Sequence, residues 1–278
     1  MYCNILTQKE HPKYRVVKKM AKLLLEFVEA DCIYFNEAEE ESKIGMMTVI
    51  VGKESLYYYD EVYDHLWKVI QNHEKFIICL FNKDCIKYEV KKGNLFFIFH
   101  CRETELVYKN DRQKPILDIR NIKVKRLIKK TKKRYRMWTS EASTVGRDFK
   151  YYRKNNNLLM AFYVLHQQFR YLFINASWLL TGEWIHHESI TDQQEHVGIF
   201  KSSFGKVFDV TIEKEKNILE KMNSARNTIQ WGKESEPFDL ESADYANEKL
   251  QWFKKEVEAV FLEKIEKVKE IFNNDGNR

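Results

Sequence analysis

The longest regular pattern of apolar residues lies between residues 156 and 181. Apolar side chains recur there at alternating steps of four and three residues, at Leu158, Phe162, Leu165, Phe169, Leu172, Ala176 and Leu179. This spacing places them on one face of a helix that packs against other helices. Related patterns predict helices near 137–155, 190–200, 210–231 and 241–273. Helices joined by such short connections predict an antiparallel bundle over residues 137–278.

The first 110 residues follow a different pattern. A helical pattern near 13–30 is followed by short apolar runs that predict strands at 32–35, 46–51 and 76–81. An amphipathic helix is expected at 57–72, and residues 95–108 are expected to close the domain. The predicted fold class is therefore α+β, with a small α+β domain over 1–110 followed by the all-α bundle.

Composition limits the class of protein. No apolar run reaches the ~18 uncharged residues of a membrane span, and the N-terminus lacks the apolar core of a signal peptide. We therefore expect a cytoplasmic protein with no membrane partner. The cysteines are irregularly spaced, which suits neither a disulfide framework nor a zinc site, and free thiols are expected at Cys3, Cys32, Cys79, Cys85 and Cys101.

Basic residues without any acid occupy the segment from 119 to 137, in a chain whose net charge is +6. The candidate nucleic-acid-binding residues are Arg120, Lys123, Lys125, Arg126, Lys129, Lys130, Lys132, Lys133 and Arg134, and Arg136 follows them. Helical spacing would align Lys123, Arg126, Lys130 and Arg134, and Tyr135 and Trp138 offer rings that stack on bases. Two interpretations remain open for residues 111–136: a phosphate-binding segment, or a solvated basic connector that pairs with an acidic surface.

Residues 158–167, the apolar helix half that follows, and the pair His186 and His187 beyond Gly182 resemble the HEPN domain. HEPN domains are small helical bundles of prokaryotic ribonucleases, toxins and nucleotide-binding modules. Upstream segments resemble bacterial proteins that fuse a nucleotidyltransferase-like domain to a C-terminal HEPN domain; these are 46–52, 57–73, 76–81, 92–97 and 105–108. The resemblance implies RNA or nucleotide as a partner, and a homodimer formed through the bundle.

The nucleotidyltransferase-like part departs from the pattern that the resemblance implies. That family uses a Gly-Ser turn for the triphosphate and an Asp-x-Asp pair for divalent metal. Here residues 36–38 read Asn-Glu-Ala, and Met46 and Thr48 stand at the two carboxylate positions. Since neither side chain can replace an anionic ligand, we expect a degenerate domain with no metal, no cofactor and no nucleotidyl transfer. The glutamates at 37–41 are expected to form a solvated loop.

The HEPN-like part also lacks half of a motif. HEPN ribonucleases pair an Arg with a His four to six residues away and cleave RNA without metal. No arginine precedes His186 or His187 at that distance, so a catalytic pair would need Arg226, which otherwise lies at the edge of a helix face. His166 is expected to be a structural histidine with a polar partner, and Arg170 stands where the family has Glu.

Two functions follow from these observations. The favoured one is a non-catalytic nucleotide- or RNA-binding protein, or a regulatory interaction protein. The alternative is a metal-independent endoribonuclease that uses His186 or His187 with Arg226.

Overall fold

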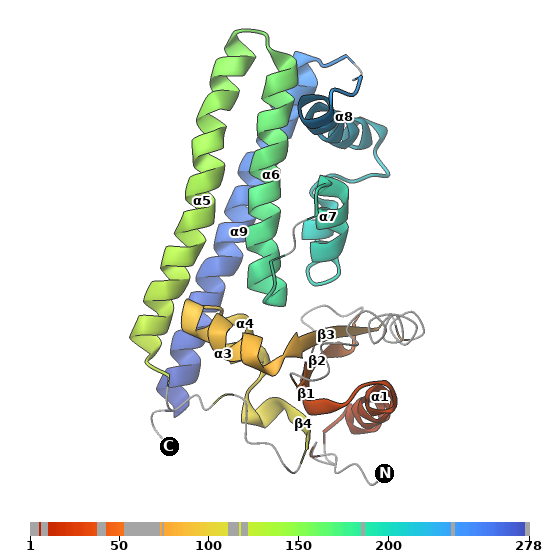
Figure 1. The fold of residues 1–278 in the computed structure, drawn as a ribbon, viewed down its shortest axis with the longest axis vertical. Helices are drawn as coiled ribbons and strands as arrows, with labels where there is room; N and C mark the ends of the chain where they lie inside the picture. The colour runs from red at the N-terminus through yellow and green to blue at the C-terminus, as the bar shows by residue number, and fades with distance from the viewer. Residues whose placement is uncertain are drawn as a thin grey trace. The chain divides into compact units, whose positions relative to one another are not determined.

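The computed structural model of the chain describes residues 6, 11–37, 43–52, 73, 75–110, 117, 122–184, 187–234 and 237–275. The chain divides into two compact units, one formed by Met1–Leu127 with Val268–Arg278 and the other by Ile128–Lys267. The first unit holds a mixed β-sheet, and the second is helical (Figure 1). The α+β class is therefore confirmed.

The sheet of the first unit has the strand order β3-β2-β1-β4. Its strands are β1 (Ala30–Glu37), β2 (Gly45–Val51), β3 (Phe76–Asn82) and β4 (Leu106–Lys109). β1 pairs antiparallel with both β2 and β4, whereas β2 and β3 are parallel. The three predicted strands are present. The helix predicted at 57–72 lies outside the described residues.

Both faces of this sheet are covered. α1 (Tyr14–Phe27) buries Val17, Met20, Ala21 and Leu24 against the face that carries Ile33, Phe35, Met47, Val49 and Leu80. On the other face Phe81 contacts Phe96 and Phe97, at ring-centroid distances of 5.5 and 4.9 Å. These rings belong to α4 (Phe96–His100), which follows α3 (Lys83–Lys92). Coverage on both faces explains why the strands read as continuous apolar runs.

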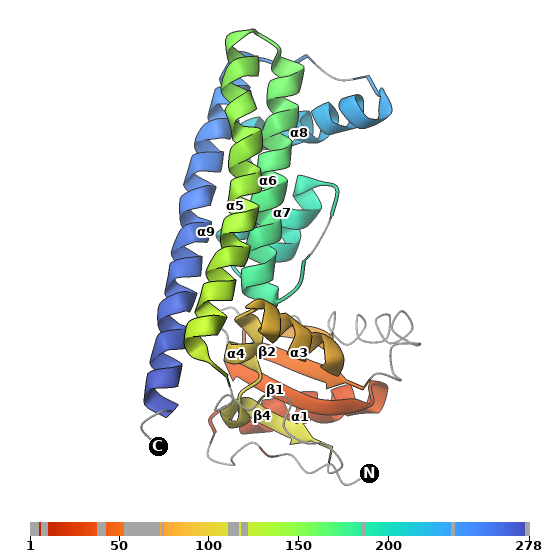
Figure 2. The same cartoon turned by 60° about the vertical axis from the view of Figure 1, so that its left-hand side comes forward.

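The helical unit is built from α5 (Val124–Lys154), α6 (Leu158–Thr181), α7 (Ile190–Gly198), α8 (Glu213–Trp231) and α9 (Leu240–Asp275). Figures 1 and 2 show α6 and α9 running in the same direction, both antiparallel to α5, with α8 crossing α6. The expected antiparallel arrangement thus holds for α5 but not between α6 and α9. The described residues between 128 and 267 include no strand, as predicted.

α6 is the central helix of this unit. It begins after Asn157, whose side chain accepts a hydrogen bond from the Met160 amide at 3.3 Å, and it ends at Gly182 in the left-handed conformation with φ 78°. The predicted apolar positions from Phe162 to Leu179 are buried. Phe169 and Phe173 reach Phe253 of α9, while α7 and α8 also pack against α6. This position leaves α6 buried on almost every side.

The predicted start of the first bundle helix, residue 137, is wrong. α5 begins at Val124, so residues 124–136 form its first turns and are not a separate connector. A sparse inward stripe of Leu127, Thr131 and Tyr135 anchors these turns, since all three side chains are buried.

No helix in the described ranges combines the length and apolar composition that a membrane crossing requires.

Candidate functional site

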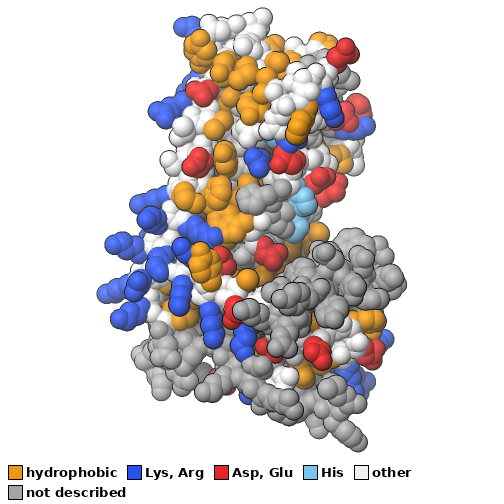
Figure 3. All heavy atoms as spheres, viewed as in Figure 1, with side chains coloured by type: hydrophobic (Ala, Val, Ile, Leu, Met, Phe, Trp, Pro, Cys, Tyr) orange, Lys and Arg blue, Asp and Glu red, His pale blue; other side chains and the backbone are white. Residues whose placement is uncertain are grey.

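The exposed side of α5 carries a line of basic side chains. We call it the basic stripe; it consists of Lys129, Lys132, Lys133, Arg136, Arg147, Lys150 and Lys154, all exposed. A helix turns about 100° per residue, so all of these except Lys133 fall within an arc of roughly 60°. The rise of about 1.5 Å per residue makes the line roughly 38 Å long. Figure 3 shows Lys and Arg side chains gathered where Figure 1 draws α5.

All charged side chains of the basic stripe are positive. None of its members forms an ion pair with a carboxylate of the described residues. The acids of α5, Glu141 and Asp148, lie roughly 130–150° around the helix axis from the centre of the stripe. On α9, by contrast, Lys254 and Lys255 stand beside glutamates at 256 and 258. α5 therefore presents a concentrated positive potential that the exposed side of α9 does not.

The structure separates the predicted basic residues into two groups. The exposed group consists of Lys123, Lys125, Arg126, Lys129, Lys132 and Lys133. Lys130 is half-buried, and Arg120 lies outside the described residues. Arg134 is also half-buried, because its guanidinium stacks on Trp184 and Trp178 at 4.1 and 5.3 Å from the ring centroids. The line predicted through Lys123, Arg126, Lys130 and Arg134 thus turns partly inward.

The expected base-stacking rings are also used internally. Tyr135 is buried against Phe261, and Trp138 packs on Trp184 at 4.8 Å between ring centroids. The prediction that Tyr135 and Trp138 offer surfaces for bases is therefore wrong for Tyr135, while Trp138 keeps only part of its surface. Three members of the basic stripe were not among the predicted residues: Arg147, Lys150 and Lys154. Their spacing repeats that of Lys129, Lys132 and Arg136 after 18 residues.

The predicted catalytic residues do not come together as a His–Arg pair among the described residues. His186 lies outside them. His187 is exposed; its ring is 6.3 Å from that of His196, and its carbonyl accepts a hydrogen bond of 2.8 Å from Gln193 Nε2. Arg226 forms an ion pair with Glu188, and no hydrogen bond joins it to His187 in this part of the chain.

Arg226 instead belongs to a group of polar side chains from α6, α8 and the segment between α6 and α7. We call this group the arginine cluster; it consists of His166, Arg170, Glu188, Asn223 and Arg226. The Glu188 carboxylate pairs with Arg226 through Oε2 and lies 3.9 Å from Arg170 Nη2 through Oε1. Packing of α6 against α8 brings these residues together from distant parts of the sequence.

His166 is the most buried member of the arginine cluster, with no exposed surface. Burial first, and then the positive charges of Arg226 and Arg170, lower its pKa to about 3, although hydrogen bonds with the Glu188 backbone and the Asn223 side chain act in the opposite direction. The imidazole is therefore neutral at pH 7. Gln167 Nε2 lies 3.3 Å from Nδ1, and the ring also has the Asn223 side chain and the Glu188 backbone as hydrogen-bonding neighbours. The expected polar partners of this histidine are therefore present.

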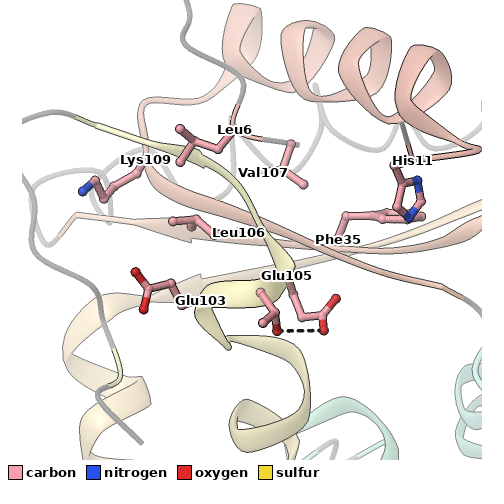
Figure 4. Close-up of a pocket in the computed structure, with 9 residues that line it drawn as sticks. Leu6, His11, Phe35, Glu103, Glu105, Leu106, Val107 and Lys109 are labelled. Carbon is pink, nitrogen blue, oxygen red and sulfur yellow. Dashed lines mark hydrogen bonds between the residues drawn. The ribbon is translucent and has the colours of Figure 1, made fainter. Parts of the chain in front are cut away.

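A pocket of about 440 Å³ lies beside β4 in the first unit (Figure 4). It is lined by Leu6, His11, Phe35, Glu103, Thr104, Glu105, Leu106, Val107 and Lys109. The Glu105 carboxylate accepts hydrogen bonds from Arg102 Nη2 at 2.6 Å and from Thr104 Oγ1 at 3.1 Å. Two carboxylates in the lining, against Lys109 and the Arg102 guanidinium that is already paired with Glu105, leave no positive excess for a triphosphate.

The strand positions expected to hold metal carry buried, uncharged side chains. Thr48 has no exposed surface and Met46 is 8% exposed. The described residues contain no group of three or more His, Cys, Asp or Glu side chains arranged to hold a metal ion.

Comparison of the chain with protein-family models, with curated proteins and with solved structures found no match.

Proposed function

We propose that this protein binds RNA without cleaving it, through the basic stripe of α5. The observation that supports the proposal is the length and single sign of the stripe: unpaired lysines and arginines extend along about 38 Å of one helix face. RNA is the chosen polyanion because the resemblance of the helical unit to HEPN domains implies it. Contacts of this kind are made to phosphates and are largely independent of base sequence.

Fluorescence anisotropy with a labelled RNA hairpin tests the proposal. Neutralising several phosphates releases counterions, so the affinity of the native protein should fall by orders of magnitude between about 50 and 200 mM salt. The variant K129E/K132E should bind at least tenfold more weakly and show a shallower salt dependence. Unchanged binding by this variant would remove the basis of the proposal.

The matched control is K254E/K255E. It reverses the same number of exposed lysines on α9, where glutamates follow at 256 and 258. Because both variants change the net charge equally, a general charge effect would weaken binding in both. We expect only the α5 variant to lose affinity, and circular dichroism should show that both variants keep their helix content.

A DNA hairpin of the same sequence and a gel of the incubated RNA extend this experiment. Tighter binding of RNA than of DNA supports RNA as the partner, whereas a preference for DNA contradicts it. Intact RNA is expected after prolonged incubation without metal. Cleavage that disappears in His187→Ala would establish the endoribonuclease alternative in place of simple binding.

A further inference from the structure

The arginine cluster holds more positive charge than its own acid neutralises. Arg170 and Arg226 face one carboxylate, that of Glu188, and the neutral His166 adds no negative charge. The side chains of Arg226 and Arg170 are 12% and 25% exposed, so water screens these charges only weakly. A half-buried site with one surplus cation favours a second anion or one of higher charge.

Two buried guanidinium nitrogen atoms of the cluster, Nε of Arg170 and Nε of Arg226, have no hydrogen-bond partner among the described residues. The guanidinium Nε atoms carry hydrogen and can only donate. The neutral His166 ring adds one further N–H, which has the Asn223 side chain and the Glu188 backbone as hydrogen-bonding neighbours. Gln167 Nε2 can only donate, so Nδ1 accepts, and in the neutral ring Nε2 then bears the proton.

The cluster therefore combines unpaired N–H donors with one carboxylate, that of Glu188, which offers only two acceptor oxygens. Buried donors are normally paired, and planar guanidinium groups favour anions whose oxygens can accept two hydrogen bonds at once. A phosphate group offers more acceptor oxygens than a carboxylate and a charge between −1 and −2. It matches both the surplus charge and the unpaired donors better than Glu188 does.

We propose that the arginine cluster is a binding site for a phosphate group, and that the Glu188 carboxylate occupies this site when no ligand is bound. Glu188 is the one member that can leave without disturbing the core, because its side chain is 58% exposed whereas His166 is fully buried. Asn223 is held in place from the other side: it accepts from the Ile190 amide at 3.2 Å and donates to Thr191 Oγ1 at 3.3 Å.

This site is separate from the basic stripe and uses none of its residues. The phosphate could be inorganic phosphate, a mononucleotide or the 5′ end of an RNA, and these share the chemistry that the cluster recognises. Isothermal titration with inorganic phosphate, adenosine 5′-monophosphate and adenosine distinguishes the first two sources. An RNA hairpin with and without a 5′-phosphate distinguishes the third.

Glu188→Gln is the central variant, because the amide keeps the shape of the side chain and removes its competing charge. Phosphate affinity should rise at least fivefold in this variant. Adding Arg170→Gln should abolish the gain, and Arg170 is sufficiently exposed for the double variant to fold. A control titration with chloride at the same ionic strength separates the general effect of salt from the binding of phosphate.

The variant K129E/K132E is the control for the stripe and should bind phosphate as the native protein does. Loss of phosphate binding in this control would assign the effect to the stripe and overturn the proposal. Equal phosphate affinity in the native protein, in Glu188→Gln and in the double variant would overturn it as well. Binding of adenosine with no response to phosphate would also contradict a phosphate site.

Discussion

The ring of Tyr135 lies flat on the ring of Phe261, with centroids 3.9 Å apart and planes inclined by 6°. The pair joins α5 to α9, and both side chains are buried. Replacing Tyr135 by Ala removes the stack and leaves a cavity, so the free energy of unfolding should fall by about 3–5 kcal/mol. Urea unfolding followed by circular dichroism measures this, with Tyr151→Ala, an exposed tyrosine of the same helix, as the control. Equal stability of the two variants would show that the stack does not hold α5 to α9.

Arg134 should behave as a packing residue and not as a phosphate contact. Its guanidinium lies 4.1 Å from the centroid of the Trp184 ring, an attraction worth about 0.5–2 kcal/mol. Arg134→Met should lower the free energy of unfolding by that amount and change tryptophan fluorescence. RNA affinity should fall much less than in K129E/K132E. An equal loss of RNA affinity in both variants would show that Arg134 is part of the RNA-binding surface.

His166 should make stability depend on pH. Its pKa is about 3 in the folded chain, whereas an unfolded histidine titrates near its usual 6.5. Below that value the unfolded state binds a proton that the folded state does not bind, so stability falls as pH decreases and the loss ends near pH 3. Lowering the pH from 7 to 5 should therefore cost about 2 kcal/mol through His166.

The variant His166→Gln isolates this effect from the titration of carboxylates. It should be less stable than the native protein at pH 7, because the buried site is disturbed, but its stability should fall less between pH 7 and 5. Urea midpoints at both values provide the comparison. Parallel decreases in the two proteins would mean that His166 is protonated in the folded state at pH 5.

Metal-dependent nucleotidyl transfer should be absent. The buried Met46 and Thr48 occupy the strand positions at which carboxylates would hold the metal. Incubation with labelled nucleoside triphosphates, magnesium or manganese and varied acceptors should give no incorporation. Transfer that is lost when a glutamate of the first unit is replaced would contradict this.

His187 should contribute little to stability, because its side chain is exposed. His187→Ala should change the free energy of unfolding by less than about 0.5 kcal/mol. Thermal unfolding of His187→Ala and His166→Ala tests this difference between the two histidines. In His166→Ala the free energy of unfolding should fall by about 1–3 kcal/mol, because a buried polar group is left unpaired. A large loss in His187→Ala would place this histidine in the core.

The sequence predicted those parts of the fold in which local pattern and burial agree. α6 has a regular apolar stripe, a capping asparagine and a terminal glycine, and all three signals act within a few residues. The start of α5 was missed because Leu127, Thr131 and Tyr135 provide only a thin apolar stripe among basic residues. RNA as a partner, a homodimer and the HEPN relationship remain predictions.

The arginine cluster could not be predicted from spacing. His166 and Arg170 are one helical turn apart and could be placed on the same side of a helix, but Arg226 lies 56 residues beyond Arg170 and reaches Glu188 only through the packing of α8 on α6. Local patterns specify the face of a helix and not the element that covers it. The polar composition of the cluster is therefore a property of the tertiary structure.

The repeat within the basic stripe gives it two points of attachment. Lys129, Lys132 and Arg136 recur five turns later as Arg147, Lys150 and Lys154, which places the two groups roughly 27 Å apart. In a B-form duplex each strand carries one phosphate per about 3.4 Å of helix axis, so a duplex with that rise must extend over roughly eight base pairs to reach both. Shorter molecules engage one group at a time, whereas longer ones gain from the high effective concentration of the second. The helix would then select RNA by its length and not by its sequence.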